Sequence, residues 1–145
     1  MYIEKAHEAT QELLEALQQL IPQLGAHKLP PTREELAALI QSESSTLLMA
    51  RYPDEEGPIT GILSLTIYRV PTGVRSIVED VVVDENMRRR GIGAELLRHA
   101  IALAREAGAN GVALTSNARR EAANRLYRAL DFKQRDTNAY MYELQ

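Results

Sequence analysis

The stretch Val81–Ala94, which reads VVVDENMRRRGIGA, constrains the fold of this chain more than any other segment. Its three consecutive β-branched residues favour a buried strand, and turn-forming residues follow from Asp84 to Met87. An amphipathic pattern that favours a helix begins near Gly93. Between strand and helix lie three arginines and two glycines, so backbone N–H groups, a positive helix end and cationic side chains can converge on one small volume. The stretch therefore predicts a strand, a phosphate-binding loop and a helix, in this order.

The composition limits the protein classes in which such a loop can occur. A chain of 145 residues with 45% hydrophobic content fits one domain with a sizeable core. Its 17 Lys and Arg against 20 Asp and Glu give a net charge of -3, which argues against a nonspecific nucleic-acid binder. Without cysteine, disulfides, thiolate metal sites and a cysteine nucleophile are excluded, and the three histidines have no metal-like spacing. We therefore expect no metal and no nucleic-acid partner.

The N-terminal residues predict the compartment. They carry acidic groups where a secretory signal would need a basic segment followed by an apolar one. No apolar run reaches the length of a membrane span. We expect a cytoplasmic protein with no membrane partner.

Hydrophobic periodicity predicts the elements before the loop. Ile3 can belong to a short first strand, and a helix over Leu13–Leu24 follows, with its last turn kinked or shortened at Pro22. A second helix begins at Thr32, whose spacing to Glu35 fits a capping box. Three strands should then form an antiparallel meander, at Thr46–Arg51, Ile59–Tyr68 and Ser76–Val83.

After the loop, the pattern predicts alternating helices and strands. A helix from about Gly93 should end at Gly108, and a short buried strand follows within Gly111–Thr115. Because a helix connects them, this strand and Ser76–Val83 should be parallel neighbours with a right-handed crossover. A further helix is predicted over Ala118–Leu130, and the tail Phe132–Leu144 is interpreted as one or two closing strands.

Spacing separates three kinds of phosphate-binding loop. A P-loop requires G-x-x-x-x-G-K-[ST], which is absent, and a dinucleotide fingerprint requires a third small residue where this chain has Leu96. The remaining pattern is Arg88-x-x-Gly91-x-Gly93, placed after a strand and before a helix. It resembles the acetyl-CoA signature of the GNAT superfamily of N-acetyltransferases.

The resemblance covers essentially the whole chain. The segment VEDVVV, Val78–Val83, is similar to the strand before the family signature, and ANRLYRALDF, Ala123–Phe132, is similar to a later A-x-x-x-Y-x-x-L-G-F segment. Two positions depart from the family pattern. Asp131 stands where glycine is usual, and Asp tolerates a left-handed backbone better than most residues, so we expect the turn to survive. Arg120 stands where many members carry a CoA-contacting asparagine.

The resemblance implies the fold class. It is α/β (α+β), with a GNAT-like mixed, mostly antiparallel central sheet of six to seven strands. About four helices should flank this sheet, with a parallel strand pair next to the CoA loop. Residues 1–145 are expected to form a single N-acetyltransferase domain.

The resemblance also implies acetyl-CoA as the acetyl donor. Backbone N–H groups of the loop would hold its pyrophosphate, and the backbone of the preceding strand would pair with the pantetheine arm as an added strand does. A backbone N–H near Val81 could also face the thioester carbonyl. The matching cofactor-binding positions are Val81, Val82, Val83, Arg88, Arg89, Arg90, Gly91, Ile92, Gly93, Ala94, Asn124 and Tyr127. Arg88 is expected either to pair with phosphate or to brace the loop.

Two catalytic candidates follow. Aminolysis of a thioester needs a deprotonated amine, so Glu79 is the candidate general base, with Asp80 as the reserve and a structural or substrate-contacting carboxylate as the alternative. By strand alternation Glu79 shares a face with Val81 while Asp80 points the other way, unless a bulge intervenes. Tyr127 matches the family tyrosine that hydrogen-bonds the CoA sulfur. Because a phenol is a weaker acid than a thiol, stabilisation of the thiolate is the safer role, and a core tyrosine is the alternative.

We therefore predict an N-acetyltransferase that moves the acetyl group directly to a primary amine. The acceptor, a small-molecule amine or a protein amine, stays open, although Tyr68 and the segment Arg135–Tyr140 are candidates for its pocket. A homodimer is also left open. The rival hypotheses are a non-catalytic acyl-CoA-binding or regulatory module, and a partner domain whose loop binds phosphate on a protein or nucleotide.

Overall fold

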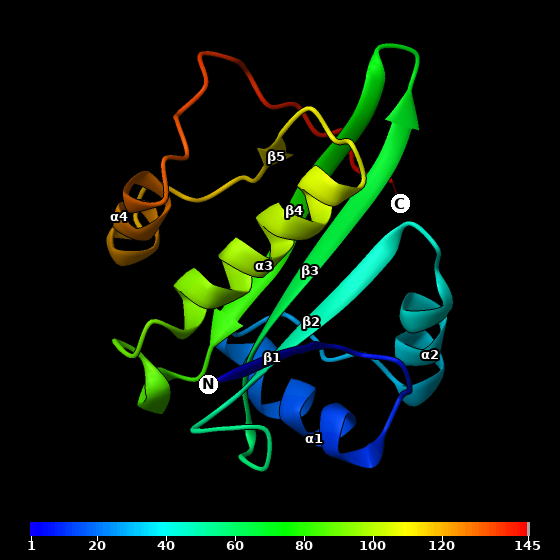
Figure 1. The fold of residues 1–145 in the computed structure, drawn as a ribbon, viewed down its shortest axis with the longest axis vertical. Coiled ribbons are helices and arrows are strands. Elements are labelled where there is room, and N and C mark those ends of the chain that lie inside the picture. Colours follow the sequence, from blue (N-terminus) through cyan, green and yellow to red (C-terminus); the bar gives the residue numbers. More distant parts are fainter. Residues whose placement is uncertain (145) are drawn as a thin grey trace. The chain divides into compact units, whose positions relative to one another are not determined.

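The computed structural model describes residues 1–144 and divides into two compact units, Met1–Thr115 and a shorter one that begins at Ser116. In the first unit, five strands form one sheet whose spatial order follows the sequence (Figure 1). These strands are β1 (Tyr2–Lys5), β2 (Ser45–Arg51), β3 (Ile59–Val70), β4 (Gly73–Val83) and β5 (Val112–Ala113). Strands β1 to β4 pair antiparallel, and the pairing of β2, β3 and β4 confirms the predicted three-strand meander.

Two N-terminal helices form as their capping residues predict. Helix α1 (Gln11–Leu20) begins after Thr10, whose hydroxyl accepts the Leu13 N–H at 3.1 Å. Pro22 lies in the short 3₁₀ helix η1 (Ile21–Gln23), so the predicted shortening before Gly25 is confirmed. Helix α2 (Arg33–Gln41) begins with the predicted capping box between Thr32 and Glu35.

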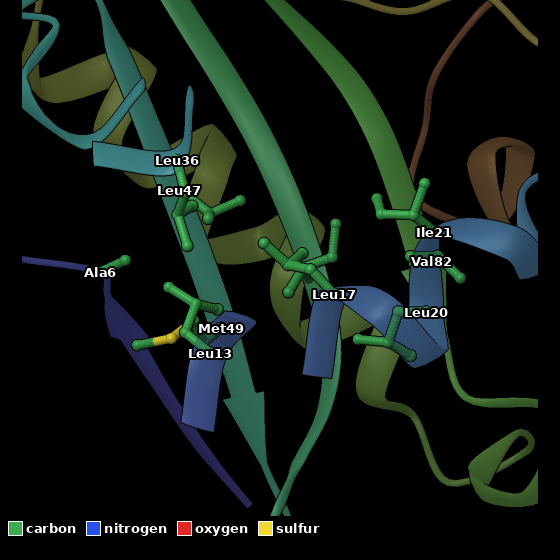
Figure 2. Packing of buried hydrophobic residues seen from close by; sticks show 10 residues of the cluster. Ala6, Leu13, Leu17, Leu20, Ile21, Leu36, Leu47, Met49 and Val82 are labelled. Carbon is green, nitrogen blue, oxygen red and sulfur yellow. The ribbon is translucent and has the colours of Figure 1, made fainter. Parts of the chain in front are cut away.

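One hydrophobic core cluster lies between these helices and one face of the sheet. Figure 2 shows its members from α1, α2, β2 and β4 pointing toward one another. The largest side chains of this cluster that are almost fully buried are Leu13, Leu20, Leu36 and Ile62. Burial of such apolar side chains supplies most of the free energy that holds α1 and α2 on the sheet.

Helix α3 (Ile92–Glu106) packs against the sheet on the opposite face. Ile62 belongs to the core beneath α1, and adjacent strand residues point to opposite faces, so Gly61 faces α3. A Cβ at Gly61 would lie 3.1 Å from the Val82 carbonyl oxygen and 3.3 Å from Leu96 Cδ1. Glycine at this position therefore lets α3 approach the sheet closely.

Strand β5 pairs parallel with β4, which confirms the predicted strand–helix–strand unit. Ser76 lies opposite Val112, and the Ser76 hydroxyl donates a hydrogen bond of 2.7 Å to the Gly111 carbonyl oxygen. The pairing covers only two positions of β4, Ser76 and Ile77. The parallel pair is therefore short and lies away from the loop.

The second unit contains helix α4 (Glu121–Ala129), within the predicted range Ala118–Leu130. The prediction of closing strands in Phe132–Leu144 is wrong, because residues 132–144 contain no strand, and the described sheet has five strands instead of six to seven. An extended segment becomes a strand only when its backbone hydrogen-bonds to the edge of another strand. An alternating pattern of side chains does not supply that partner. In the tail, Tyr140, Tyr142 and Leu144 are between 87% and 91% exposed.

No helix between residues 1 and 144 is both long enough and apolar enough to cross a membrane.

Candidate functional site

Strand β4 contains a bulge at Asp80, directly before the Val81–Val83 run. Ser64 of β3 lies opposite Glu79, whereas Ile62 lies opposite Val82, so two steps along β3 correspond to three along β4. Asp80 has a φ of 48°, in the left-handed region that few residues other than glycine adopt. One extra residue is thus inserted into β4, and Asp and Asn are the non-glycine residues that tolerate its conformation best.

The bulge changes which side chains share a face. Glu79 falls in register with Ser64, which lies on the same side of β3 as Ile62, while Asp80 and Val81 together face the single residue Leu63. Simple alternation, which would put Glu79 with Val81 and Asp80 opposite, therefore does not hold here. The side chains of both Glu79 and Asp80 are exposed.

Beyond the bulge, one edge of β4 has no strand partner among residues 1–144. Strand β5 pairs only with Ser76 and Ile77, so the edge of Val78–Val83 that faces away from β3 is open. An open edge presents backbone N–H and C=O groups at regular intervals and can bind an extended chain.

The loop begins with the short 3₁₀ helix η2 (Glu85–Met87), which Asp84 caps. The Asp84 carboxylate accepts the Asn86 N–H at 3.1 Å, and the Asp84 N–H donates to the Thr60 carbonyl oxygen at 2.8 Å. After η2, the side chains of Arg88, Arg89 and Arg90 are all exposed. Arg88 Nε donates a long hydrogen bond of 3.4 Å to the Val83 carbonyl oxygen, so Arg88 braces the loop weakly.

Helix α3 then begins with an open N-terminus. Gly91 is its N-cap, with φ 78° and ψ 10°, and no side chain caps the first turn. A Cβ placed on Gly91 would meet no atom within 4 Å. Within residues 1–144, the N–H groups of Ile92, Gly93 and Ala94 have no hydrogen-bond acceptor. These three donors and the positive end of the helix dipole can bind an anion.

Tyr52, in the turn between β2 and β3, contacts this loop. The Arg90 guanidinium carbon lies 5.3 Å from the centre of the Tyr52 ring, which is within cation–π range. Sequence reasoning missed Tyr52, since no local pattern connects a turn tyrosine to an arginine in a distant loop.

In the second unit, Tyr127 lies on α4 and is only 9% exposed. Its ring packs edge-on against Phe132, with centroids 6.0 Å apart, and its carbonyl oxygen accepts the Phe132 N–H at 2.9 Å. Burial raises the pKa of the Tyr127 phenol, and the Arg120 cation partly opposes this shift. Asp131 has a φ of 68°, so the left-handed turn expected in place of the family glycine is present.

Asn124 braces the segment before α4. Its Nδ2 donates to the Asn117 carbonyl oxygen at 3.0 Å, and its backbone N–H donates to the Arg120 carbonyl oxygen at 3.0 Å. The side-chain Oδ1 of Asn124 has no hydrogen-bond partner among residues 1–144. The predicted contact of Asn124 with the cofactor stays a prediction.

Comparison with known proteins identifies the family. The model of the acetyltransferase (GNAT) family matches residues 9–132. The chain belongs to the GNAT family. This GNAT protein is therefore an acyltransferase, and members of its family generally use acetyl-CoA. No curated protein sequence matches it.

Solved structures share the fold of this GNAT protein at low sequence identity. An aminoglycoside acetyltransferase from an uncultured soil metagenomic sample, in complex with trehalose, is 20% identical with a TM-score of 0.81, and 99% of this chain and 96% of that chain are covered. A ribosomal-protein-alanine N-acetyltransferase from Brucella melitensis is 22% identical with a TM-score of 0.78, covering 99% and 100%. An acetyltransferase from Trypanosoma brucei is 21% identical with a TM-score of 0.77, covering 98% and 99%.

The predicted site residues of this GNAT protein fall into two groups. The first unit brings Glu79, the run Val81–Val83 and the segment Arg88–Ala94 into one continuous strand, loop and helix start. The second unit places Asn124 and Tyr127 one turn apart on α4.

Proposed function

We propose that this protein transfers an acetyl group from acetyl-CoA directly to a primary amine. The observation that carries the proposal is the open edge of β4 that leads, through the arginine loop, into the uncapped N-terminus of α3. One continuous stretch thus offers a backbone edge for an extended arm and free N–H donors for a pyrophosphate. We also propose that residues 1–145 act as one N-acetyltransferase domain, because the family model extends over residues 9–132.

The donors of the loop suit a phosphorylated cofactor. The N–H groups of Ile92, Gly93 and Ala94 would hold the pyrophosphate, and Arg89 would add positive charge beside them. The missing Cβ at Gly91 leaves room for phosphate oxygens. When bound, acetyl-CoA supplies a thioester that an amine can attack.

The bulge suits the reacting end of that cofactor. The backbone of Val81–Val83 would bind the pantetheine arm, and a bulge at Asp80 redirects the backbone groups next to it. An N–H near Val81 would then donate to the carbonyl oxygen of the thioester.

Glu79 would remove the proton from the acceptor amine. Neither Glu79 nor Asp80 forms an ion pair or side-chain hydrogen bond with any of residues 1–144, and both are exposed, so either carboxylate can reach a substrate ammonium or a water. Glu79 is the first candidate because Asp80 has a backbone role in the bulge.

Tyr127 would donate a hydrogen bond to the leaving thiolate. Burial raises its pKa, so the phenol keeps its proton throughout the neutral range and stays available as a donor. A hydrogen bond to a charged group contributes about 1.5–3 kcal/mol, which corresponds to roughly tenfold to hundredfold in rate.

The acceptor would be a small-molecule amine or a protein amine. The names of two structural neighbours, an aminoglycoside acetyltransferase and a ribosomal-protein-alanine N-acetyltransferase, support these two classes. Tyr68, which is 39% exposed on β3, and the exposed segment Arg135–Tyr140 remain candidates for contact with the acceptor.

A panel of amines, followed by release of free thiol from acetyl-CoA, tests this function. We expect Glu79→Gln and Tyr127→Phe each to lower kcat at least tenfold on the best substrate. Glu106→Gln and Tyr142→Phe are matched controls on exposed positions and should leave kcat unchanged. Calorimetry with acetyl-CoA accompanies the panel, and no binding at millimolar concentration would refute the proposed function.

A further inference from the structure

We propose that two side chains outside the loop, Gln23 and Tyr52, act as positioning residues that hold residues 84–94, here called the acetyl-CoA loop, in the conformation that binds the cofactor. The role in cofactor binding depends on the function proposed above. The contacts themselves are features of the first unit and can be tested without any ligand.

Gln23 contacts the beginning of the acetyl-CoA loop. Its Oε1 accepts the backbone N–H of Glu85, the first residue of η2, at 2.9 Å. Its Nε2 donates to the Gln19 carbonyl oxygen at 3.2 Å. The Gln23 amide thus connects the Gln19 carbonyl group, near the end of α1, to the Glu85 N–H, at the start of η2. This connection requires both a donor and an acceptor on the same side chain.

The position of Gln23 is itself fixed by packing. Gln23 is the last residue of η1, two positions after Ile21. Ile21 is buried in the same core cluster as Val82 of β4. The Gln23 amide therefore extends from a segment that packs on β4, the strand that leads into the loop.

Tyr52 contacts the far part of the acetyl-CoA loop. Its ring lies under the Arg90 guanidinium at 5.3 Å, one residue before Gly91. The turn that carries Tyr52 is tightly held, since Arg51 donates to the Gly57 carbonyl oxygen at 3.0 Å. A Cβ on Gly57 would come within 2.1 Å of the Tyr52 carbonyl oxygen. Tyr52 thus belongs to a turn whose backbone is held by these contacts.

The middle of the loop, residues 88–90, gains most from such support because it is exposed. Arg88, Arg89 and Arg90 are exposed and Arg89 has a φ of 65°. Within residues 1–144, the side-chain hydrogen bond of Arg88 is a long one of 3.4 Å to the Val83 carbonyl oxygen. A loop that is disordered before binding loses conformational entropy when the ligand orders it, and this cost weakens affinity. Gln23 and Tyr52 would reduce the cost by ordering the loop in the free protein.

The test uses the whole chain with Gln23→Met and Tyr52→Leu. Gln18→Met repeats the first change at an exposed glutamine of α1, and Tyr142→Leu repeats the second at an exposed tail tyrosine. We expect Gln23→Met to raise the Kd of acetyl-CoA roughly threefold to tenfold and Tyr52→Leu roughly twofold to fivefold, with both controls unchanged. Tyr52→Phe keeps the aromatic face and should restore the wild-type Kd.

Two readouts separate positioning from catalysis and from general damage. The KM for acetyl-CoA should rise in step with Kd, while kcat at saturation stays within about twofold of wild type. In the ligand-free protein, hydrogen exchange should accelerate at the Glu85 amide in Gln23→Met, while amides of the β3 core keep their protection.

The outcomes distinguish this inference from the proposed function. If wild type binds acetyl-CoA and both variants bind it equally well, or if kcat falls while KM is unchanged, the positioning role is refuted and the proposed function stands. If wild type does not bind acetyl-CoA, the proposed function fails and the role in cofactor binding fails with it. Unchanged exchange at Glu85 in Gln23→Met would refute the structural contact itself.

Discussion

At the scale of single residues, Gly91 combines a left-handed backbone with open space beside its Cα. Its φ of 78° is strained for any residue with a Cβ, yet the space beside it is empty to 4 Å. A substitution at Gly91 therefore tests backbone conformation without a steric clash inside the protein.

We expect Gly91→Ala to lower the free energy of unfolding by about 1–2 kcal/mol, because the left-handed conformation is unfavourable for alanine. Gly111→Ala is the matched control, since its Cβ would also meet no atom within 4 Å but its φ is not in the left-handed region. It should be neutral or stabilising by up to about 1 kcal/mol, through lower entropy of the unfolded chain. Urea unfolding measures both, and equal losses would contradict the assignment of strain to Gly91.

At the scale of elements, the bulge in β4 depends on the backbone of Asp80. We expect Asp80→Val to lower the free energy of unfolding by about 1–2 kcal/mol, because a β-branched residue strongly disfavours a φ of 48°. Asp80→Gly should be as stable as wild type or more so, since glycine adopts this conformation freely. Urea unfolding of the two variants is the measurement, and a Gly variant less stable than the Val variant would argue against the bulge.

A second relation between elements is the ion-pair network around Arg51. Arg51 of β2 contacts Glu4 of β1 at 2.8 Å and Glu12 of α1 at 2.7 Å, so it joins two strands and a helix. The hydrogen bond from Arg51 lowers the pKa of the Glu12 carboxyl below its ordinary value of 4.5, while burial opposes this shift and the charge of Arg51 adds to it. A carboxyl whose folded pKa is lowered stabilises the protein above the unfolded pKa, and this stability is lost as pH falls through the folded pKa.

We expect Glu12→Gln to lower the free energy of unfolding at pH 7 by only about 0.5–1 kcal/mol, since the half-exposed carboxylate is screened by solvent. The difference from wild type should shrink below pH 4.5 and disappear once Glu12 is protonated in the folded state. Glu15→Gln is the control, because Glu15 accepts a hydrogen bond only from the neutral Gln11 amide. Urea unfolding between pH 3 and 7 measures the effect, and a pH-independent loss would contradict the charge-based explanation.

At the scale of the whole molecule, the proposed function predicts stabilisation by the donor. A ligand present at about 100 times its Kd raises the free energy of unfolding by about 2.7 kcal/mol, which for a chain of this size shifts Tm by about 5–10 °C. We expect this shift with acetyl-CoA in differential scanning calorimetry, and no shift with ATP or NAD at the same concentration. Equal shifts with all three would indicate a general phosphate site.

The sequence predicted the local parts of the fold because they depend on neighbouring residues. The capping box at Thr32, the shortened helix at Pro22 and the strand, loop and helix of Val81–Ala94 are all present where the pattern puts them. Each of these follows from backbone preferences and hydrogen bonds within a few residues, which the sequence displays directly.

Features that depend on distant partners escaped the sequence. The tail Phe132–Leu144 has the alternation of a strand but lacks strand hydrogen bonds, because these must come from another segment. Likewise, Gln23 reaches Glu85 and Tyr52 reaches Arg90 only after the sheet brings their elements together.

The sequence by itself determined the family, the order of the elements before the tail and the stretch proposed to hold the donor. Periodicity, capping and loop spacing depend on residues that are close together in the sequence. Only the tertiary structure decided the bulge at Asp80, the open edge of β4 and the contacts of Gln23 with Glu85 and of Tyr52 with Arg90. Strand register is a relation between two strands, and one strand's residues do not specify where its partner inserts or omits a pairing.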